Sequence, residues 1–161
     1  MVSAASARKA QLRREQHAAK RQDDGGPLAW RGWFDGSAHP NPGRLGIGAL
    51  LLGPDGERIE ISEPAGDGDS SDAEYAALTA LLQAALLVKP AQLLLCGDSQ
   101  VVIHDVLGTA VVKGLAAERA TVLALMEQLP DVSLRWVPRH RNGEADRLSQ
   151  RAITAATSRS D

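Results

Sequence analysis

The chain has 161 residues, 43% of them apolar, so it has enough material for one domain with a buried core but not for two. Aromatic residues make up only 3% of the chain, which argues against a base-stacking platform built from rings. The single cysteine, Cys96, has no partner for a disulfide or a zinc site. No apolar run reaches the roughly 18 residues of a membrane helix, and no signal peptide is apparent, so we expect a cytoplasmic protein.

Charge is distributed unevenly. The net charge is −2, but residues 1–26 hold six basic and three acidic side chains, which leaves −5 for the remainder. Residues 3–22 are mostly Ala, Arg, Lys and Gln and cannot bury enough apolar surface to pack as an ordered element. We therefore expect a basic tail over 1–26, disordered or a solvated helix, then a folded domain over 27–157 and a disordered C-terminus over 158–161.

Three predicted strands open the folded part. Residues 30–34, 45–52 and 58–62 are strand-like, and Gly53-Pro54-Asp55-Gly56 joins the last two as a turn. Residues 73–88 are rich in Ala and Leu nearly all round, which predicts a helix covered on more than one face.

The second half alternates strands with helices. A short apolar run over 92–96 is typical of a strand buried on both faces. The further elements are predicted helices over 99–106 and 116–129, a strand over 132–137 and a final helix over 144–155. The order β-β-β-α-β-α-α-β-α predicts an α/β fold, a mixed sheet with helices on its faces.

Four carboxylates stand at predicted strand ends or helix starts, and each one alone has a structural explanation. Asp35 precedes a glycine, as in many turns, and Glu74 matches a capping box that begins at Ser71. Asp98 could cap the helix that follows it, and Asp146 suits a first helical turn, where the dipole favours an acid.

Taken together, the same four carboxylates indicate a metal site. The strands before Asp35 and Asp98 would deliver both side chains to one edge of the sheet, and Glu74 and Asp146 can point at that edge. Four like charges repel one another unless a cation lies among them, and oxygen ligands without cysteine suit Mg²⁺ or Mn²⁺.

Four motifs, in order along the chain, resemble those of the ribonuclease HI family. Residues 34–43, followed by Gly46-Ile47-Gly48-Ala49, look like the family's first strand and turn. Residues 73–78, 97–100 and 142–148 look like its second, third and fourth acidic motifs. The resemblance implies a ribonuclease H-like fold with a five-stranded sheet of order 3-2-1-4-5, strand 2 antiparallel, and helices on both faces.

The resemblance also implies an activity. The protein would be an endoribonuclease that hydrolyses the RNA strand of RNA-DNA hybrids and leaves 5′-phosphate ends. Two Mg²⁺ ions, or Mn²⁺, about 3.5 to 4 Å apart would be held by the four carboxylates, with Asp35 bridging both. His140, four residues after Trp136, would assist proton transfer or product release. No small-molecule cofactor is expected, and we expect a monomer.

Substrate contacts follow from the same resemblance. Asn41 and Gln100 match positions that hydrogen-bond the RNA strand, whose 2′-hydroxyls distinguish it from DNA. Further positions expected to bind the hybrid are Gly36, Ser37, Ser71 and Asn142. Asp69 stands where the family commonly has a small hydroxyl residue that holds a DNA phosphate, and an acid there would repel it. The family's basic insertion is missing, and the basic tail could compensate through phosphate contacts.

Two alternatives stay open. A nuclease of the same fold could act on other duplexes, such as RNA-DNA junctions or double-stranded RNA. A nucleic-acid-binding or partner-binding module could instead have kept the fold and lost catalysis, although the presence of all four carboxylates argues against this.

Overall fold

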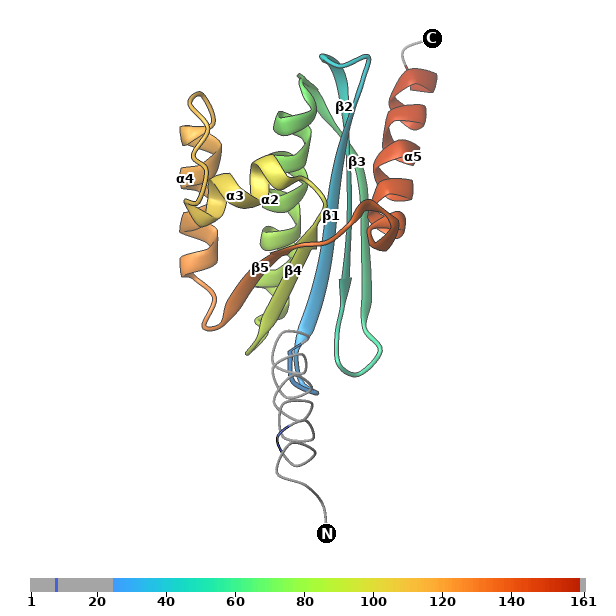
Figure 1. Cartoon of the computed structure of the whole chain (residues 1–161). Coiled ribbons are helices and arrows are strands. Elements are labelled where there is room, and N and C mark those ends of the chain that lie inside the picture. The colour runs from blue at the N-terminus through green and yellow to red at the C-terminus, as the bar shows by residue number, and fades with distance from the viewer. Residues whose placement is uncertain (1–7, 9–24, 160–161) are drawn as a thin grey trace.

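The structure is a computed structural model that describes residue 8 and residues 25–159 (Figure 1). The tail expected over 1–26 thus lies almost wholly outside the described residues. The last helix reaches Arg159, two residues past the end that we expect for the folded domain. Among the described residues, no helix combines the length and the apolar character needed to cross a bilayer.

The elements occur in the order predicted from the sequence. The strands are β1 (Trp30–His39), β2 (Gly43–Leu52), β3 (Arg58–Gly68), β4 (Leu93–Gly97) and β5 (Val132–Trp136). The helices are α2 (Ser70–Val88), α3 (Gln100–Leu107), α4 (Ala116–Glu127) and α5 (Gly143–Arg159), with a 3₁₀ helix, η1 (Arg139–Arg141), before α5.

The five strands form one mixed sheet in the order β3-β2-β1-β4-β5. Strand β2 is antiparallel to β1 and β3, whereas β4 runs parallel to β1 and β5. The predicted sheet is therefore confirmed, including its order and the direction of its second strand.

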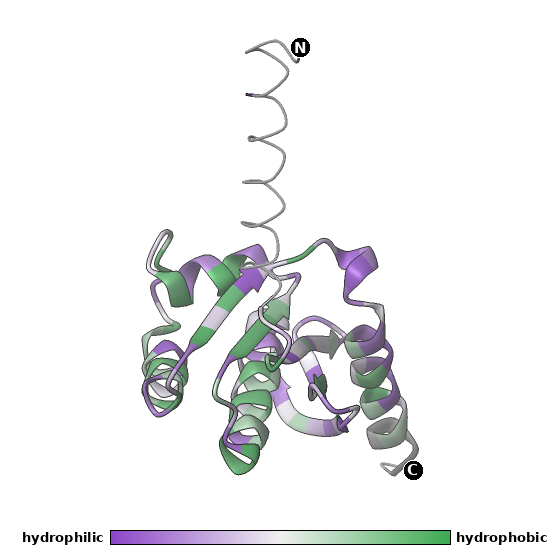
Figure 2. Cartoon of the chain, turned by 90° about the horizontal axis from the view of Figure 1, so that it is seen from below, coloured by the Kyte–Doolittle hydropathy of each residue, from purple (hydrophilic) through white to green (hydrophobic). Residues whose placement is uncertain are grey.

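Helices cover both faces of the sheet. Figure 1 shows α2, α3 and α4 on one face and α5 on the other, and Figure 2 shows the same layers from below. The main core lies under α2, where Phe34, Leu81 and Leu95 are fully buried. Every residue of β4 is buried, as the continuous apolar run predicts for a strand between two neighbours.

Several element ends differ from the prediction. β1 and β3 extend well past residues 34 and 62, because the ladder with β2 continues to the pair His39–Arg44 and pairs polar residues as readily as apolar ones. α2 begins at Ser70, three residues early. Its capping box is made by Asp69 and Asp72, so the assignment of that box to Ser71 and Glu74 is wrong.

Two glycines let α5 lie directly against β2. A Cβ on Gly48 would overlap the carbonyl oxygen of Ala145 and the backbone nitrogen of Ser149, and a Cβ on Gly46 would overlap the Ser149 carbonyl oxygen. Any larger residue would therefore hold the helix away from the sheet. This close approach determines how α5 meets the functional site.

Candidate metal centre

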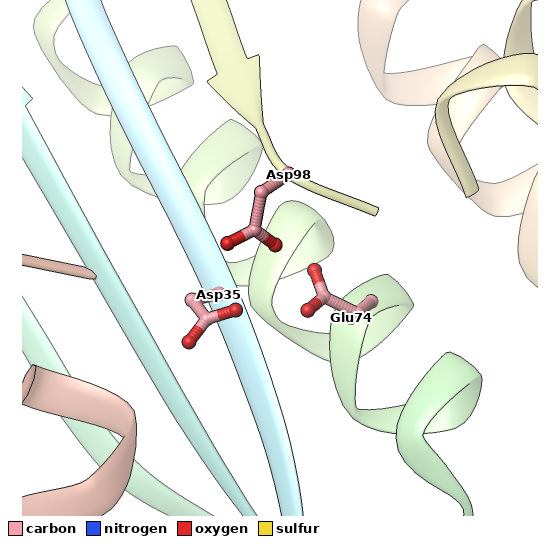
Figure 3. A group of neighbouring side chains, drawn as sticks. All are labelled: Asp35, Glu74 and Asp98. Carbon is pink, nitrogen blue, oxygen red and sulfur yellow. The ribbon is translucent and has the colours of Figure 1, made fainter. Parts of the chain in front are cut away.

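Three carboxylates from three elements meet at one end of the sheet. Asp35 lies in β1, Glu74 in α2 and Asp98 directly after β4, and each offers a ligand oxygen within 4.8 Å of the others (Figure 3). Asp35 and Asp98 are neighbours because β1 and β4 run parallel, with Phe34 beside Gly97. The two acids therefore meet as predicted, although Asp35 lies within β1 and not at its end.

All four predicted carboxylates line one cavity of about 320 Å³. Asp146, in the first turn of α5, lies at this cavity but outside the group of three. The lining residues are Asp35, Gly36, Ser37, Glu74, Asp98, Arg139, Asp146 and Gln150. The predicted set thus meets in space, with one member held farther out.

Burial dominates the electrostatics of the two inner carboxylates. It raises the pKa of Asp35 to about 7, where a hydrogen bond with Glu74 opposes the shift and the charge of Asp98 adds to it. It also raises the pKa of Glu74, to about 10, and the charge of Asp35 raises it further. Both carboxyls resist ionisation until a cation compensates their charge.

Asp98 is not the cap of α3, and its carboxyl interacts with Asn142 and Arg139 instead. Burial raises its pKa, while the Asn142 side chain and the charge of Arg139 lower it. Ser99 caps α3, because its hydroxyl accepts a hydrogen bond from the Val102 nitrogen at 3.3 Å. The alternative reading of Asp98 as a helix cap is therefore wrong, and its carboxylate is available for ligands.

Two side chains fix the backbone around the carboxylates. Asn142, 1% exposed, donates from Nδ2 to the carbonyl oxygen of Phe34 at 2.9 Å, just before Asp35. Trp136 donates from Nε1 to the carbonyl oxygen of Asp98 at 3.1 Å. Asn142, expected to bind substrate, is thus placed as a link between β1 and the loop before α5.

The arrangement fits a hard divalent cation. Among the described residues, Glu74 Oε2 is buried without a hydrogen-bond partner, and a buried carboxylate oxygen is costly without a donor or a cation. All nearby ligand atoms are carboxylate oxygens, the donor type that Mg²⁺ and Mn²⁺ prefer. Asp35, Glu74 and Asp98 could therefore hold the metal, with Asp146 close by.

The structure separates His140 from the carboxylates. His140 is exposed and lines another cavity, of about 460 Å³, together with Trp33, Leu50 and Leu52. Its neighbour Arg139 lines the carboxylate cavity instead. Successive residues of a 3₁₀ helix point about 120° apart, so only one residue of η1 faces a given site. Sequence spacing contains no signal for which one that is.

The predicted substrate contacts lie in different places. Gly36 and Ser37 line the carboxylate cavity. Asn41 Oδ1 accepts a hydrogen bond from the Ser70 nitrogen at 3.2 Å, at the start of α2, where Ser71 is half-buried. Gln100 is exposed at the start of α3.

Two further residues at the centre escaped the sequence argument. Gln150 lines the cavity, and Ser149, which is fully buried, donates to Asp35 Oδ2 at 3.2 Å. Ser149 and Gln150 follow Asp146 by three and four residues on a helix, which places them on the same side as that carboxylate. This spacing is a sequence signal that identifies both residues.

A mixed five-stranded sheet of this order, with one acid in its first strand and another directly after its fourth, defines a ribonuclease H-like protein. The family model described as reverse transcriptase-like matches residues 33–152. The ribonuclease HI of Halobacterium salinarum is 33% identical over 127 residues, which cover 77% of this chain and 64% of that protein. The chain belongs to the ribonuclease HI family.

Solved structures agree. Ribonuclease H1 from H. salinarum has a TM-score of 0.75 at 32% identity, over 79% of this chain and 98% of that one. LC11-RNase H1, in complex with an RNA/DNA hybrid, has a TM-score of 0.73 at 27% identity, over 80% and 99%.

The match to longer proteins is partial. The bifunctional protein Rv2228c of Mycobacterium tuberculosis is 32% identical over 126 residues, which cover 76% of this chain but only 35% of that protein. The N-terminal ribonuclease H domain of Rv2228c, solved as a fusion protein, has a TM-score of 0.73 at 30% identity, over 78% of this chain and 98% of that one.

Proposed function

We propose that the protein is a metal-dependent ribonuclease H that hydrolyses the RNA strand of RNA-DNA hybrids. The observation that carries the proposal is the meeting of Asp35, Glu74 and Asp98 within 4.8 Å in a cavity that Asp146 also lines. A relative solved with an RNA/DNA hybrid supports the choice of substrate.

The four carboxylates Asp35, Glu74, Asp98 and Asp146 would hold two divalent ions, Mg²⁺ or Mn²⁺. When bound, such ions activate a water molecule and stabilise the leaving oxygen of the phosphodiester, which gives 5′-phosphate ends. Burial is the main cause of the raised pKa values of Asp35 and Glu74, and both would release their protons as the ions bind, because the cations would then compensate the buried charge. Arg139 would place a positive charge at the same cavity, toward the phosphate.

His140 is proposed to assist proton transfer or product release. It is exposed and adjacent to Arg139, so a turn of η1 on substrate binding would bring it toward the cavity. Support for this role comes from the position of His140 relative to Trp136 and from the family resemblance.

Contacts with the hybrid are proposed at the start of α2 and beside the cavity. Gly36 and Ser37 line the cavity, and Asn41 lies at the start of α2 with Ser71, where backbone N–H groups attract phosphate oxygens. The Asp69 carboxylate already accepts a hydrogen bond from the Asp72 nitrogen at 2.9 Å, so its role is capping. Exposed Gln100 completes the proposed set of contacts, and Asn142, which is 1% exposed, would support substrate binding by holding the backbone of β1.

The experiment is cleavage of a panel of labelled duplexes by the full chain with Mg²⁺ or Mn²⁺. We expect cleavage of the RNA strand of the hybrid, abolished by Asp98→Asn with the fold intact. Asp131→Asn, an exposed acid before β5 and at its opposite end from the cavity, is the matched control and should cleave normally.

Other outcomes of the panel would point elsewhere. Preferred cleavage of double-stranded RNA or of RNA-DNA junctions would assign the same chemistry to another duplex. Binding of the hybrid without cleavage at any metal concentration would indicate a module that has lost catalysis. The cytoplasmic location and the monomeric state stay predictions.

A further inference from the structure

We propose that Ser149 is a positioning residue that orients Asp35 for metal binding, at the end of a hydrogen-bonded chain that begins at Gln150 and passes through Ser37. The inference rests on the proposed function, since it takes Asp35 as a metal ligand.

The contacts of Ser149 place its hydroxyl between two elements. Its Oγ lies 3.2 Å from Asp35 Oδ2, 2.8 Å from Ser37 Oγ and 2.8 Å from the carbonyl oxygen of Asp146. Ser149 is fully buried, so water does not compete for these contacts. One hydroxyl of α5 thus touches the β1 carboxylate and the backbone of Asp146.

The donors and acceptors define a direction along the chain. Gln150 Nε2 can only donate, and it lies 3.0 Å from Ser37 Oγ. Ser37 therefore accepts from Gln150 and has its own proton available for Ser149 Oγ. The single proton of Ser149 then has two acceptors, and once a metal ion ionises Asp35, its carboxylate is a stronger acceptor than the carbonyl of Asp146.

The register of the sheet makes this chain possible. Asp35 pairs with Gly48, and Ser37 pairs with Gly46, so the two polar residues of β1 each stand beside a glycine of β2. Because these glycines have no side chains, the backbone of Ser149 reaches β2 and its hydroxyl reaches β1. The contact of Ser149 with the sheet thus depends on two pairs of residues, Gly46 and Gly48 on β2 and Asp35 and Ser37 beside them on β1.

The contact restricts the carboxylate of Asp35. A hydrogen bond at Oδ2 limits rotation of the carboxylate and leaves its second oxygen for a ligand position beside Glu74 and Asp98 (Figure 3). Hydrogen bonds that orient a metal ligand typically contribute about 10- to 100-fold to metal affinity. Ser149 therefore acts on the metal through Asp35 without contacting it.

The test measures Mn²⁺ binding by calorimetry, on the metal-free full chain and without nucleic acid. We expect Ser149→Ala to weaken Mn²⁺ binding about tenfold while the urea unfolding curve stays cooperative. Ser62→Ala is the matched control, because Ser62 also bonds α5, donating to the Leu148 carbonyl oxygen at 2.7 Å, but does not reach Asp35. Unchanged Mn²⁺ affinity in Ser149→Ala, or an equal loss in Ser62→Ala, would overturn the proposal.

Ser37→Ala tests the next link and serves if Ser149→Ala does not fold. We expect Ser37→Ala to weaken Mn²⁺ binding less than Ser149→Ala does. In the double variant, Ser37→Ala should cause no further loss of affinity, because Ser149→Ala has already interrupted the series of hydrogen bonds. If the losses of Mn²⁺ affinity in the two single variants add up in the double variant, the two serines act independently and the proposed series of hydrogen bonds is contradicted. Cleavage of hybrid by the wild type tests the proposed function separately. If the wild type does not cleave hybrid but Ser149→Ala still weakens Mn²⁺ binding, the proposed activity is refuted and the positioning role of Ser149 stands.

Discussion

Asp35 and Glu74 are carboxyls that bind their protons more tightly in the folded chain than in the unfolded one. Where folding raises a carboxyl pKa, stability is lost as pH rises from the unfolded value toward the folded one. For Asp35 this window runs from 3.8 to about 7. We expect the unfolding temperature of the metal-free protein to fall across it and Mn²⁺ to restore it at the upper end.

The measurement is thermal unfolding at both ends of the window, with and without Mn²⁺. Asp35→Asn removes one of the two titrating carboxyls and should make the dependence shallower in the metal-free protein, while Glu74 keeps part of it. The expectation would be contradicted if the unfolding temperature rose between pH 3.8 and about 7, and by the same amount in the wild type and in Asp35→Asn. Groups other than Asp35 would then control the pH dependence of stability.

Arg139 is the basic side chain that the structure places at the carboxylate cavity. We expect Arg139→Ala to lower kcat/KM for hybrid cleavage at least about tenfold, since a charged hydrogen bond to phosphate contributes about 1.5 to 3 kcal/mol. Arg139→Lys should recover part of the loss. Arg141→Ala, at the neighbouring cavity, is the comparison, and an equal loss there would mean that only general charge matters.

At the scale of elements, the contact between α5 and β2 depends on Gly48. We expect Gly48→Ala to destabilise the protein by about 2 kcal/mol, because its Cβ would overlap α5 backbone and force the helix outward. Hybrid cleavage should fall as well, since Asp146 moves with the helix. Gly143→Ala, where the added Cβ has open space, should unfold like the wild type in urea.

Asp105 ties α3 to α2 and α4. Its fully buried carboxylate accepts from the Tyr75 hydroxyl, the Val112 nitrogen at 2.7 Å and Arg119 Nη1 at 2.8 Å. Burial alone would raise its pKa, but these donors lower it overall, so the stabilisation is lost as pH falls below 3.8. We expect Asp105→Ala to cost about 3 kcal/mol in urea unfolding near neutral pH.

Exposed Asp131 again provides the control for this change, and Asp131→Ala should cost little. If Asp105→Ala unfolds at the same urea concentration as the wild type, the buried network does not stabilise the α3–α4 region. The difference between Asp105→Ala and the wild type should shrink as pH falls below 3.8, because the carboxyl is protonated first in the unfolded state and only at still lower pH in the folded one.

Periodicity predicted strands β1 to β5 and helices α2 to α5, because apolar spacing records which residues face the core, but it gave no sign of the 3₁₀ helix η1. It failed at the ends of β1 and β3, where hydrogen bonds between paired strands continue past the core without an apolar signal. The meeting of Asp35 and Asp98 was predictable because each follows an apolar run and the two runs form parallel neighbouring strands. The direction of η1 and the approach of Ser149 depend on how α5 packs, which local sequence does not record.

Across the whole molecule, charge is divided between a basic tail and an acidic remainder of −5. We expect deletion of residues 1–26 to weaken hybrid binding most at low salt, because counterion release from phosphates is lost. The plot of log affinity against log salt should become shallower by at most about five if all six bases contact phosphates. Equal affinity of both forms at low and moderate salt would exclude a role for the tail.

The end of β4 determines how far β1 is paired on both of its edges beside the candidate metal centre. Arg31 to Phe34 of β1 are paired with β2 on one edge and with β4 on the other, whereas from Asp35 onward β1 is paired only with β2. The doubly paired half can exchange its amide protons only when most of the sheet opens, so it should be among the slowest to exchange. Asp35 is the first residue beyond it, so this metal-ligand candidate combines a strand held on both edges just before it with a position at the cavity beside the end of β4.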